Sequence, residues 1–349
     1  MKIRDTLFIF LLLVFVSGCV HGSEKGGDAV GAGITQSTAG ATFHISGIPP
    51  KISAASEFDL EVTATNLGSY SFQPNDVLAT LSNTKQFTFS LNDNSFQTPS
   101  GQNGLTNDQL LMKALDSDVE GGSVAFYFSN MKYIGGTATG QEINIPLSVN
   151  TCYYYSTIAT LDVCVAEDVI SEICSSTEQK RVINQAGPIH ISGFEQEDSS
   201  VSGSVSSQAR KIDSNVIIFI SAYGNEKIEA YETTASQMDG DAVTATELKK
   251  DRLLCTNSDS NRYTAVRLKS IQVGNEILVG GEDIDRHCEV SAAPNIIMLD
   301  EEGQASVSCI LPLTRSYSSI RGDYTERMTI TLDYLISDTV TKSLTVVGT

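Results

Sequence analysis

The chain of 349 residues contains no tryptophan, and its 42 acidic residues far outnumber its 23 lysine and arginine residues. The formal net charge is therefore −19. Because lysine and arginine neutralise phosphate groups, this shortage argues against nucleic acid or an anionic lipid surface as a docking partner. The acidity itself is typical of a soluble protein surface. The absence of tryptophan gives little support to an aromatic platform for sugars.

Catalytic motifs are missing as well. No G-x-S-x-G, H-E-x-x-H, Walker A loop or G-x-G-x-x-G stands in a suitable context. The four histidines are His21, His44, His190 and His287. A hydrolytic site would require His190 or His287 to lie beside a carboxylate and a nucleophile. We therefore expect a protein that is not an enzyme and that needs no cofactor.

The chain also lacks an apolar run long enough for a transmembrane helix. Its longest run, Leu7–Val16, has ten residues, whereas a spanning helix needs about 20. Lys2 and Arg4 precede the run, and small residues follow it. This order of a basic segment, an apolar segment and small residues is typical of a signal peptide.

The residues VSGC at positions 16–19 resemble the lipobox of prokaryotic lipoproteins. The resemblance implies cleavage after residue 18 and attachment of a diacylglyceryl group to the Cys19 thiol. The mature protein would then be anchored at the cell envelope, on the outer face of the cytoplasmic membrane or the cell surface. Two acyl chains make such an anchor stable. The alternatives are an ordinary secretory signal with an incidental Cys19 and an uncleaved single-pass anchor.

Residues 19–42 are rich in glycine, serine and threonine and show no hydrophobic periodicity. Such a segment has too little apolar surface to offset its ordering entropy, so we expect a flexible tether.

Removing Cys19 from the seven cysteines leaves an even number, as expected for disulfides in an oxidising compartment. No C-x2-C spacing indicates a zinc site. Six cysteines can pair in many ways, and their spacing does not choose among them. We favour the pairs that close short loops, which leaves a third, inter-domain pair. These pairs are Cys288–Cys309, Cys164–Cys174 and Cys152–Cys255.

A short repeat divides the rest of the chain. The segment FHISGI at positions 43–48 returns as IHISGF at 189–194, and each copy is followed by an extended apolar run. This similarity predicts two related domains, residues 43–187 and 188–349, with the boundary at Gly187-Pro188. It also places His44 and His190 at equivalent strand positions, which suggests a structural role for both.

Period-two alternation of apolar and polar residues predicts many short strands. We expect strands at 58–65, 87–91, 124–128, 143–149, 152–165, 189–194, 216–222, 264–273, 305–311, 326–335 and 342–347. Short helices are expected at Asn107–Leu115 and Thr244–Leu254, and a serine-rich acidic insert at 195–207. The fold class is therefore all-β, with two tandem β-sandwich domains and short helical insertions.

The order of a strand, Gly-Ile-Pro-Pro, a turn, an alternating strand and Asn-x-Gly over residues 43–68 resembles the opening of immunoglobulin-like, CARDB-like domains of prokaryotic surface proteins. Residues 189–225 resemble it more loosely, since they lack Pro-Pro and carry the serine-rich insert. The three-cysteine segments are similar to those of archaeal secreted lipoproteins. This resemblance implies a fold and not an activity.

Two further groups of residues are candidates for binding. Clustered carboxylates favour a hard cation such as calcium, although solvated turns explain them equally well. These candidates are Asp239, Asp241, Glu282, Asp283 and Asp285, with a further acidic turn at 300–302. The aromatic runs 126–128 and 153–155 either stack on sugars or belong to the core.

Together these features favour a non-catalytic surface lipoprotein whose domains bind another surface protein or assemble the envelope. The alternative is a solute- or glycan-binding lipoprotein, which requires a concave pocket lined by aromatic side chains.

Overall fold

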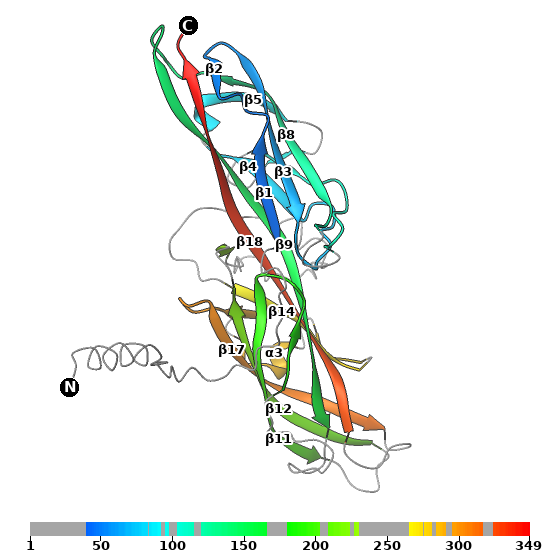
Figure 1. Ribbon diagram of the computed structural model, residues 1–349. Helices are drawn as coiled ribbons and strands as arrows, with labels where there is room; N and C mark the ends of the chain where they lie inside the picture. Colours follow the sequence, from blue (N-terminus) through cyan, green and yellow to red (C-terminus); the bar gives the residue numbers. More distant parts are fainter. Residues whose placement is uncertain are drawn as a thin grey trace, which may run out of the picture. The chain divides into compact units, whose positions relative to one another are not determined.

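The computed structural model describes most of the chain after residue 39 (Figure 1). The described residues are 40–82, 84–91, 95–97, 103–114, 120–165, 180–202, 209–223, 227–229, 265–274, 276–280, 284–290, 295–316 and 324–349. Cys19, the tether up to residue 39 and the expected helix at 244–254 lie outside them.

The described residues are almost entirely β-strand, which confirms the predicted all-β class. The strands of the first region, residues 40–133, are β1 (Ala41–Ser46), β2 (Lys51–Ser53), β3 (Glu57–Asn66), β4 (Val77–Leu81), β5 (Phe87–Leu91), β6 (Ser95–Gln97), β7 (Asn103–Thr106) and β8 (Ser123–Tyr133). Those of the second region, residues 183–316, are β10 (Ile183–Asn184), β11 (Ile189–Ser202), β12 (Ala209–Ala222), β13 (Lys227–Glu229), β14 (Ala265–Val273), β15 (Glu276–Gly280), β16 (Ile296–Met298) and β17 (Gln304–Ser316). The helical elements described are η1 (Thr84–Gln86) and α3 (Ile284–His287).

Two long strands join these regions. β9 (Glu142–Val165) and β18 (Tyr324–Val347) have 24 residues each and pair antiparallel along their whole length, from Glu142 opposite Val347 to Val165 opposite Tyr324. Figure 1 shows them side by side in green and red. We call this pair the central ribbon. Each of its strands contains two segments that the sequence predicts as separate strands.

The strands form three sheets, one of which contains the central ribbon. A four-stranded sheet has the order β1-β3-β8-β5, and a three-stranded sheet has the order β11-β12-β17. The ribbon belongs to an 11-stranded sheet with the path β15-β14-β18-β9-β4-β7-β6. β4 pairs with β9 at Val149–Tyr153, and β14 pairs with β18 at Met328–Asp333. Strands of both regions therefore belong to one hydrogen-bonded sheet.

Alternation of side chains explains how the ribbon is buried. Every second residue of β9 from Ile145 to Val165 is buried. The matching face of β18 is buried from Met328 to Ile336 and again at Leu344 and Val346. This face packs into one apolar cluster that draws residues from all three sheets. The alternation predicted for residues 58–65 is confirmed in β3, where Phe58, Leu60, Val62 and Ala64 are buried.

The two copies of the repeat occupy corresponding positions. β1 and β11 both pair antiparallel with the extended run that follows them, β3 and β12 respectively. The first backbone N–H of each of these two strands donates to a tyrosine of the ribbon: Ala41 of β1 to Tyr153 Oη and Ile189 of β11 to Tyr334 Oη, both at 3.3 Å. The two-domain, immunoglobulin-like assignment itself stays a prediction.

One local expectation is wrong. Residues 107–114 form no helix, because the Asn107 side chain accepts the Val77 N–H at 2.8 Å and Leu111 forms a bridge with Phe72. Strand pairing extends into the serine-rich acidic insert at 195–207. β11 continues through it to Ser202, and its residues 199–202 pair with residues 211–214 of β12.

Candidate functional site

The predicted aromatic runs are mainly core. Phe126 and Phe128 are 3% and 0% exposed, while Tyr127 between them is 44% exposed on the opposite face of β8. All three residues of the run 153–155 are buried. Tyr153 and Tyr155 face the main core, and Tyr154 belongs to a small cluster on the other face of the ribbon. Neither run therefore forms an exposed sugar platform.

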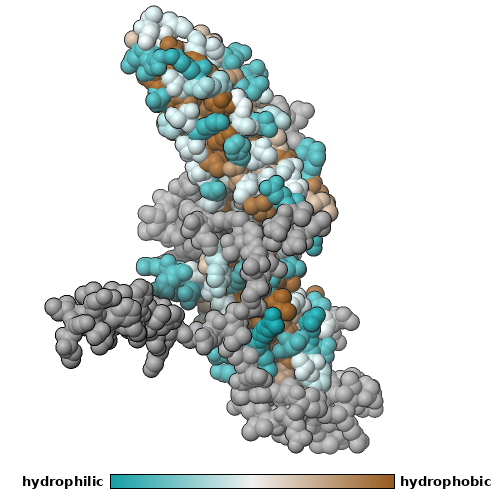
Figure 2. All heavy atoms as spheres, viewed as in Figure 1, coloured by the Kyte–Doolittle hydropathy of each residue, from teal (hydrophilic) through white to brown (hydrophobic). Residues whose placement is uncertain are grey.

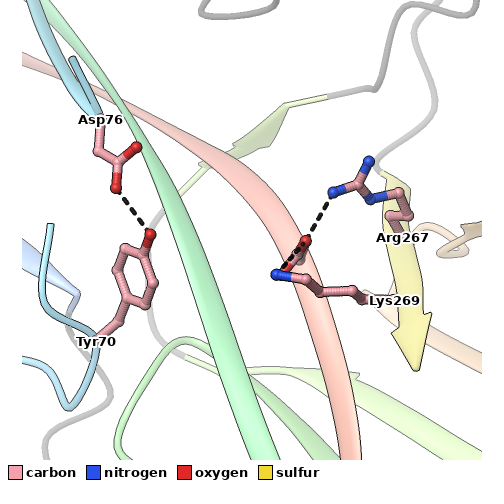
Figure 3. Close-up of polar contacts among 5 residues, drawn as sticks. Tyr70, Asp76, Arg267 and Lys269 are labelled. Carbon is pink, nitrogen blue, oxygen red and sulfur yellow. Dashed lines mark hydrogen bonds and ion pairs between the residues drawn. The ribbon is translucent and has the colours of Figure 1, made fainter. Parts of the chain in front are cut away.

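Buried charges lie on that other face of the ribbon. The Asp333 side chain on β18 is fully buried, and its Oδ2 is 2.7 Å from Arg267 Nη2 and 3.4 Å from Lys269 Nζ. Arg267 lies directly opposite Asp333 across the β14–β18 ladder. Figure 3 shows both basic side chains directed at this acceptor. One carboxylate is thus held between two cations, an arrangement in which each buried charge has a partner.

A second polar contact lies in the first region. Tyr70 Oη donates to Asp76 Oδ2 at 2.8 Å (Figure 3). The Gln73 N–H donates to the same oxygen at 2.7 Å. Burial raises the pKa of the Tyr70 hydroxyl above its ordinary value, and the Asp76 carboxylate, more than that of Asp333, adds to the effect. The tyrosine therefore stays protonated and acts as a donor.

The three histidines in the described part of the chain belong to three different elements. His44 is exposed on β1, and His287 ends α3. His190 is half-buried on β11, where its ring centroid is 4.9 Å from that of Tyr223. Burial lowers the pKa of His190, and a hydrogen bond with the Gly187 backbone opposes this in part. His190 Nε2 has no hydrogen-bond partner among the described residues.

The structure contains a disulfide between Cys288 and Cys309, which confirms that predicted pair. Cys152 and Cys164 are buried in β9, and each of them takes part in a disulfide. Cys174 and Cys255 lie outside the described residues, so the two pairs predicted with them stay predictions.

The calcium candidates are largely outside the part of the chain that the structure describes. Asp239, Asp241, Glu282 and Asp283 fall there, and only the backbone of Asp285, in α3, is described. In the acidic turn at 300–302, Asp300 Oδ1 accepts the N–H groups of Glu302 and Gln304 at 2.9 and 2.8 Å. Among the described residues, no group of three or more His, Cys, Asp or Glu side chains is placed to hold a metal ion.

Side-chain amides, which the sequence analysis missed, bind the backbone at strand edges. Asn184 Oδ1 accepts the Ile191 N–H at 2.8 Å, and its Nδ2 donates to the Ile191 carbonyl at 2.9 Å. Gln196 binds both backbone groups of Cys164 in the same way, at 3.0 and 2.6 Å. These contacts tie β11 to β10 and to the ribbon. No local sequence signal marks them, because both partners are set by the tertiary fold.

A shallow groove of about 420 Å³ lies on the three-stranded sheet. The ring of Phe219 on β12 lies against Gly193 on β11, where an added Cβ would be 3.2 Å from the ring. Five polar residues line the groove, Ser192, Ser221, Asp300, Gln304 and Ser306, and the apolar Ile220 and Ala305 complete the lining. Ser221 Oγ donates to Ser192 Oγ at 2.9 Å. Sequence reasoning missed this groove, since it depends on which residues a bulge in β11 brings together.

Apolar and polar residues are intermixed on the surface shown in Figure 2. Large apolar side chains that are at least 48% exposed include Leu110, Met112, Ile134, Ile183, Ile277 and Ile310. No helix in the described part of the chain is long and apolar enough to cross a bilayer. Comparisons with protein-family models and with curated proteins found no match.

Proposed function

We propose that this chain is a non-catalytic lipoprotein, anchored through Cys19, that binds another surface protein by adding a strand of that protein to β5. The signal peptide, the lipobox resemblance and the cysteine count support export and anchoring. The observation that carries the binding proposal is the difference between β5 and two other strands at sheet edges, β1 and β11.

Two other edge strands are capped by side chains. On β1, Tyr153 Oη accepts the Ala41 N–H at 3.3 Å, and Lys342 Nζ donates to the Ile45 carbonyl at 3.3 Å. On β11, Tyr334 Oη accepts the Ile189 N–H, and Asn184 occupies both backbone groups of Ile191. A capped edge offers few backbone groups to a further strand.

β5 differs from both. It ends the four-stranded sheet and, among the described residues, pairs with β8 alone. Its sequence, FTFSL, contains no charge and no proline, the two features with which natural edge strands usually avoid unwanted pairing. Thr88 and Ser90 are exposed. An uncharged, β-prone edge is an aggregation hazard unless a partner covers it, and strand addition would supply that partner.

We further propose that the two regions are immunoglobulin-like domains that share the central ribbon. In this interpretation each ribbon strand belongs to one domain over half its length and to the other domain over the rest. Pairing along all 24 residues supports this view. The shared strands would make the unit rigid, as suits a protein that presents a binding edge outside the cell.

Site-specific photocrosslinking of the lipidated protein in its native membranes tests the binding proposal. A photoreactive residue at Thr88 should give one discrete adduct with another protein. Ser90→Lys should reduce that adduct at least fivefold, because a charged side chain blocks pairing at the edge. The matched control is Thr42→Lys, at an exposed position of the capped strand β1. An adduct that Ser90→Lys leaves unchanged, or no adduct at Thr88, would overturn the proposal.

A further inference from the structure

The groove over Phe219 lies on the three-stranded sheet, whereas β5 belongs to the four-stranded sheet. Its volume of about 420 Å³ is within the range of about 300–1,000 Å³ that is typical of ligand sites. The groove is therefore a candidate for a second binding site, separate from β5, and the chemistry of the groove's lining indicates which ligand it would take.

The lining combines one aromatic ring with hydroxyl, amide and carboxylate groups. Phe219 supplies an apolar surface, while Ser192, Ser221 and Ser306 supply hydroxyls that both donate and accept. Gln304 adds an amide and Asp300 a carboxylate. A ligand that fits this set needs an apolar face and several hydroxyl groups at its rim, as a sugar ring has.

The charge of the lining residues narrows the class of ligand. None of the described lining residues is lysine or arginine, and Asp300 contributes a negative charge. Anionic ligands are disfavoured, because a carboxylate or phosphate would face Asp300 with no cation to neutralise it. The open, shallow form of the groove suits part of a chain molecule better than a small solute, which normally has most of its surface enclosed.

The neighbouring side chains extend the same chemistry. His190 is paired with Ser221 across the β11–β12 ladder, and its ring packs on Tyr223, which is 42% exposed. Because burial lowers the pKa of His190, its imidazole is neutral at physiological pH. This end of the groove therefore adds uncharged polar and aromatic groups and no positive charge.

We infer that the groove formed by Phe219, Ser192, Ser221, Ser306, Gln304 and Asp300 binds a neutral oligosaccharide, with one sugar ring stacked on Phe219. Phe219 is partly exposed, and its neighbours in the groove, Gly193, Ser192 and Ser221, are small. Hydroxyl groups at the edge of the sugar would exchange hydrogen bonds with the serine and glutamine side chains.

Saturation-transfer NMR on the full lipidated chain in nanodiscs tests this inference. The probes are the neutral trisaccharides maltotriose, mannotriose and chitotriose, with trigalacturonate as the acidic comparison. At least one neutral probe should bind, and trigalacturonate should bind at least tenfold more weakly. Binding of the acidic probe alone, or of none of the four, would overturn the inference.

Variants locate the site. Phe219→Ala should weaken binding of the neutral probe at least tenfold. Because Phe219 also covers Gly193, Gln304→Ala at the exposed end of the groove provides a variant with less effect on folding and should weaken binding at least threefold. Tyr127→Ala, which removes an exposed tyrosine from the four-stranded sheet, is the matched control and should leave binding unchanged. Equal binding by all three variants, or loss only in Tyr127→Ala, would contradict the assignment.

Discussion

The two regions use opposite chemistry at corresponding positions of the central ribbon. In the first, Cys152 precedes the tyrosine that binds the start of β1, and it lies opposite Leu78 in an apolar cluster. In the second, Asp333 precedes the tyrosine that binds the start of β11, and it lies opposite Arg267 in an ion pair. The inward face keeps the same tyrosine contact while the outward face differs.

This difference shows which contacts of the repeated unit must be kept and which can vary. The tyrosine hydroxyl must satisfy a buried backbone N–H, and its loss would leave that donor without a partner. The outward pair only has to be compatible with burial, which either two apolar residues or two paired charges achieve. The two solutions nevertheless respond differently to substitution.

The largest effect is expected from breaking the ion pair. Asp333→Ala removes the carboxylate that pairs with Arg267, whose side chain is 17% exposed. Loss of one member of a buried pair typically costs about 3–5 kcal/mol of unfolding free energy. Chemical denaturation of the purified protein measures this. A loss below about 1 kcal/mol would show that the carboxylate is not buried between its two cations.

Removing the two ribbon hydroxyls tests the symmetry of the comparison. Tyr153→Phe should cost about 1–2 kcal/mol through the unsatisfied N–H of Ala41. Tyr334→Phe should cost somewhat more, since Tyr334 Oη also bonds Thr157 Oγ1 at 2.6 Å. Denaturation curves of both variants give the values. If only one of the two changes stability, the tyrosines do not have equivalent roles.

The two repeat histidines should differ in their effect on pH dependence. His190 has a lowered pKa in the folded state, so protons bind preferentially to the unfolded chain. Its contribution to stability is complete above its ordinary value of 6.5 and is lost as the pH falls from there through the lowered value. Stability measured between pH 7.5 and 5 should decline less in His190→Gln than in the parent. His44→Gln, at the exposed position in β1, is the control and should follow the parent, and an identical decline in all three proteins would refute this role for His190.

The smallest effect is expected when the second region is given the chemistry of the first. The double variant Arg267→Leu with Asp333→Leu replaces both charges by apolar side chains, as at Leu78. Replacing a whole buried pair is often neutral or stabilising, so we expect a change within about 1 kcal/mol or a gain. Lys269 is 48% exposed and can turn to solvent. A loss as large as that of Asp333→Ala would show that the pair itself is required.

Local patterns predict much of this fold. The all-β class, the alternation in β3 and the strand at 87–91 follow from periodicity, and the disulfide Cys288–Cys309 agrees with the preference for a pair that closes a short loop. The continuity of the ribbon strands was missed, although a signal is present. Every odd-numbered position from Ile145 to Val165 is buried, so a single alternation runs through Asn150 and Thr151.

Long-range contacts explain what the sequence does not predict. The expected helix at 107–115 was based on local propensity. In the structure, the Asn107 side chain accepts the N–H of Val77, which is 30 residues away in the sequence. The groove depends on the register that places Gly193 opposite Phe219, and the ion pair depends on β14 lying beside β18. None of these neighbours is visible in one segment of sequence.

Hydrogen exchange at the middle of the central ribbon tests the shared-strand account most directly. Amides of residues 150–157 and 332–339 lie where two independent domains would need linkers. If the ribbon is continuous, their exchange should be as slow as that of the flanking residues, which are 145–149 and 159–163 on β9 and 326–330 and 340–344 on β18. Fast exchange confined to the middle, with slow exchange on either side, would contradict it.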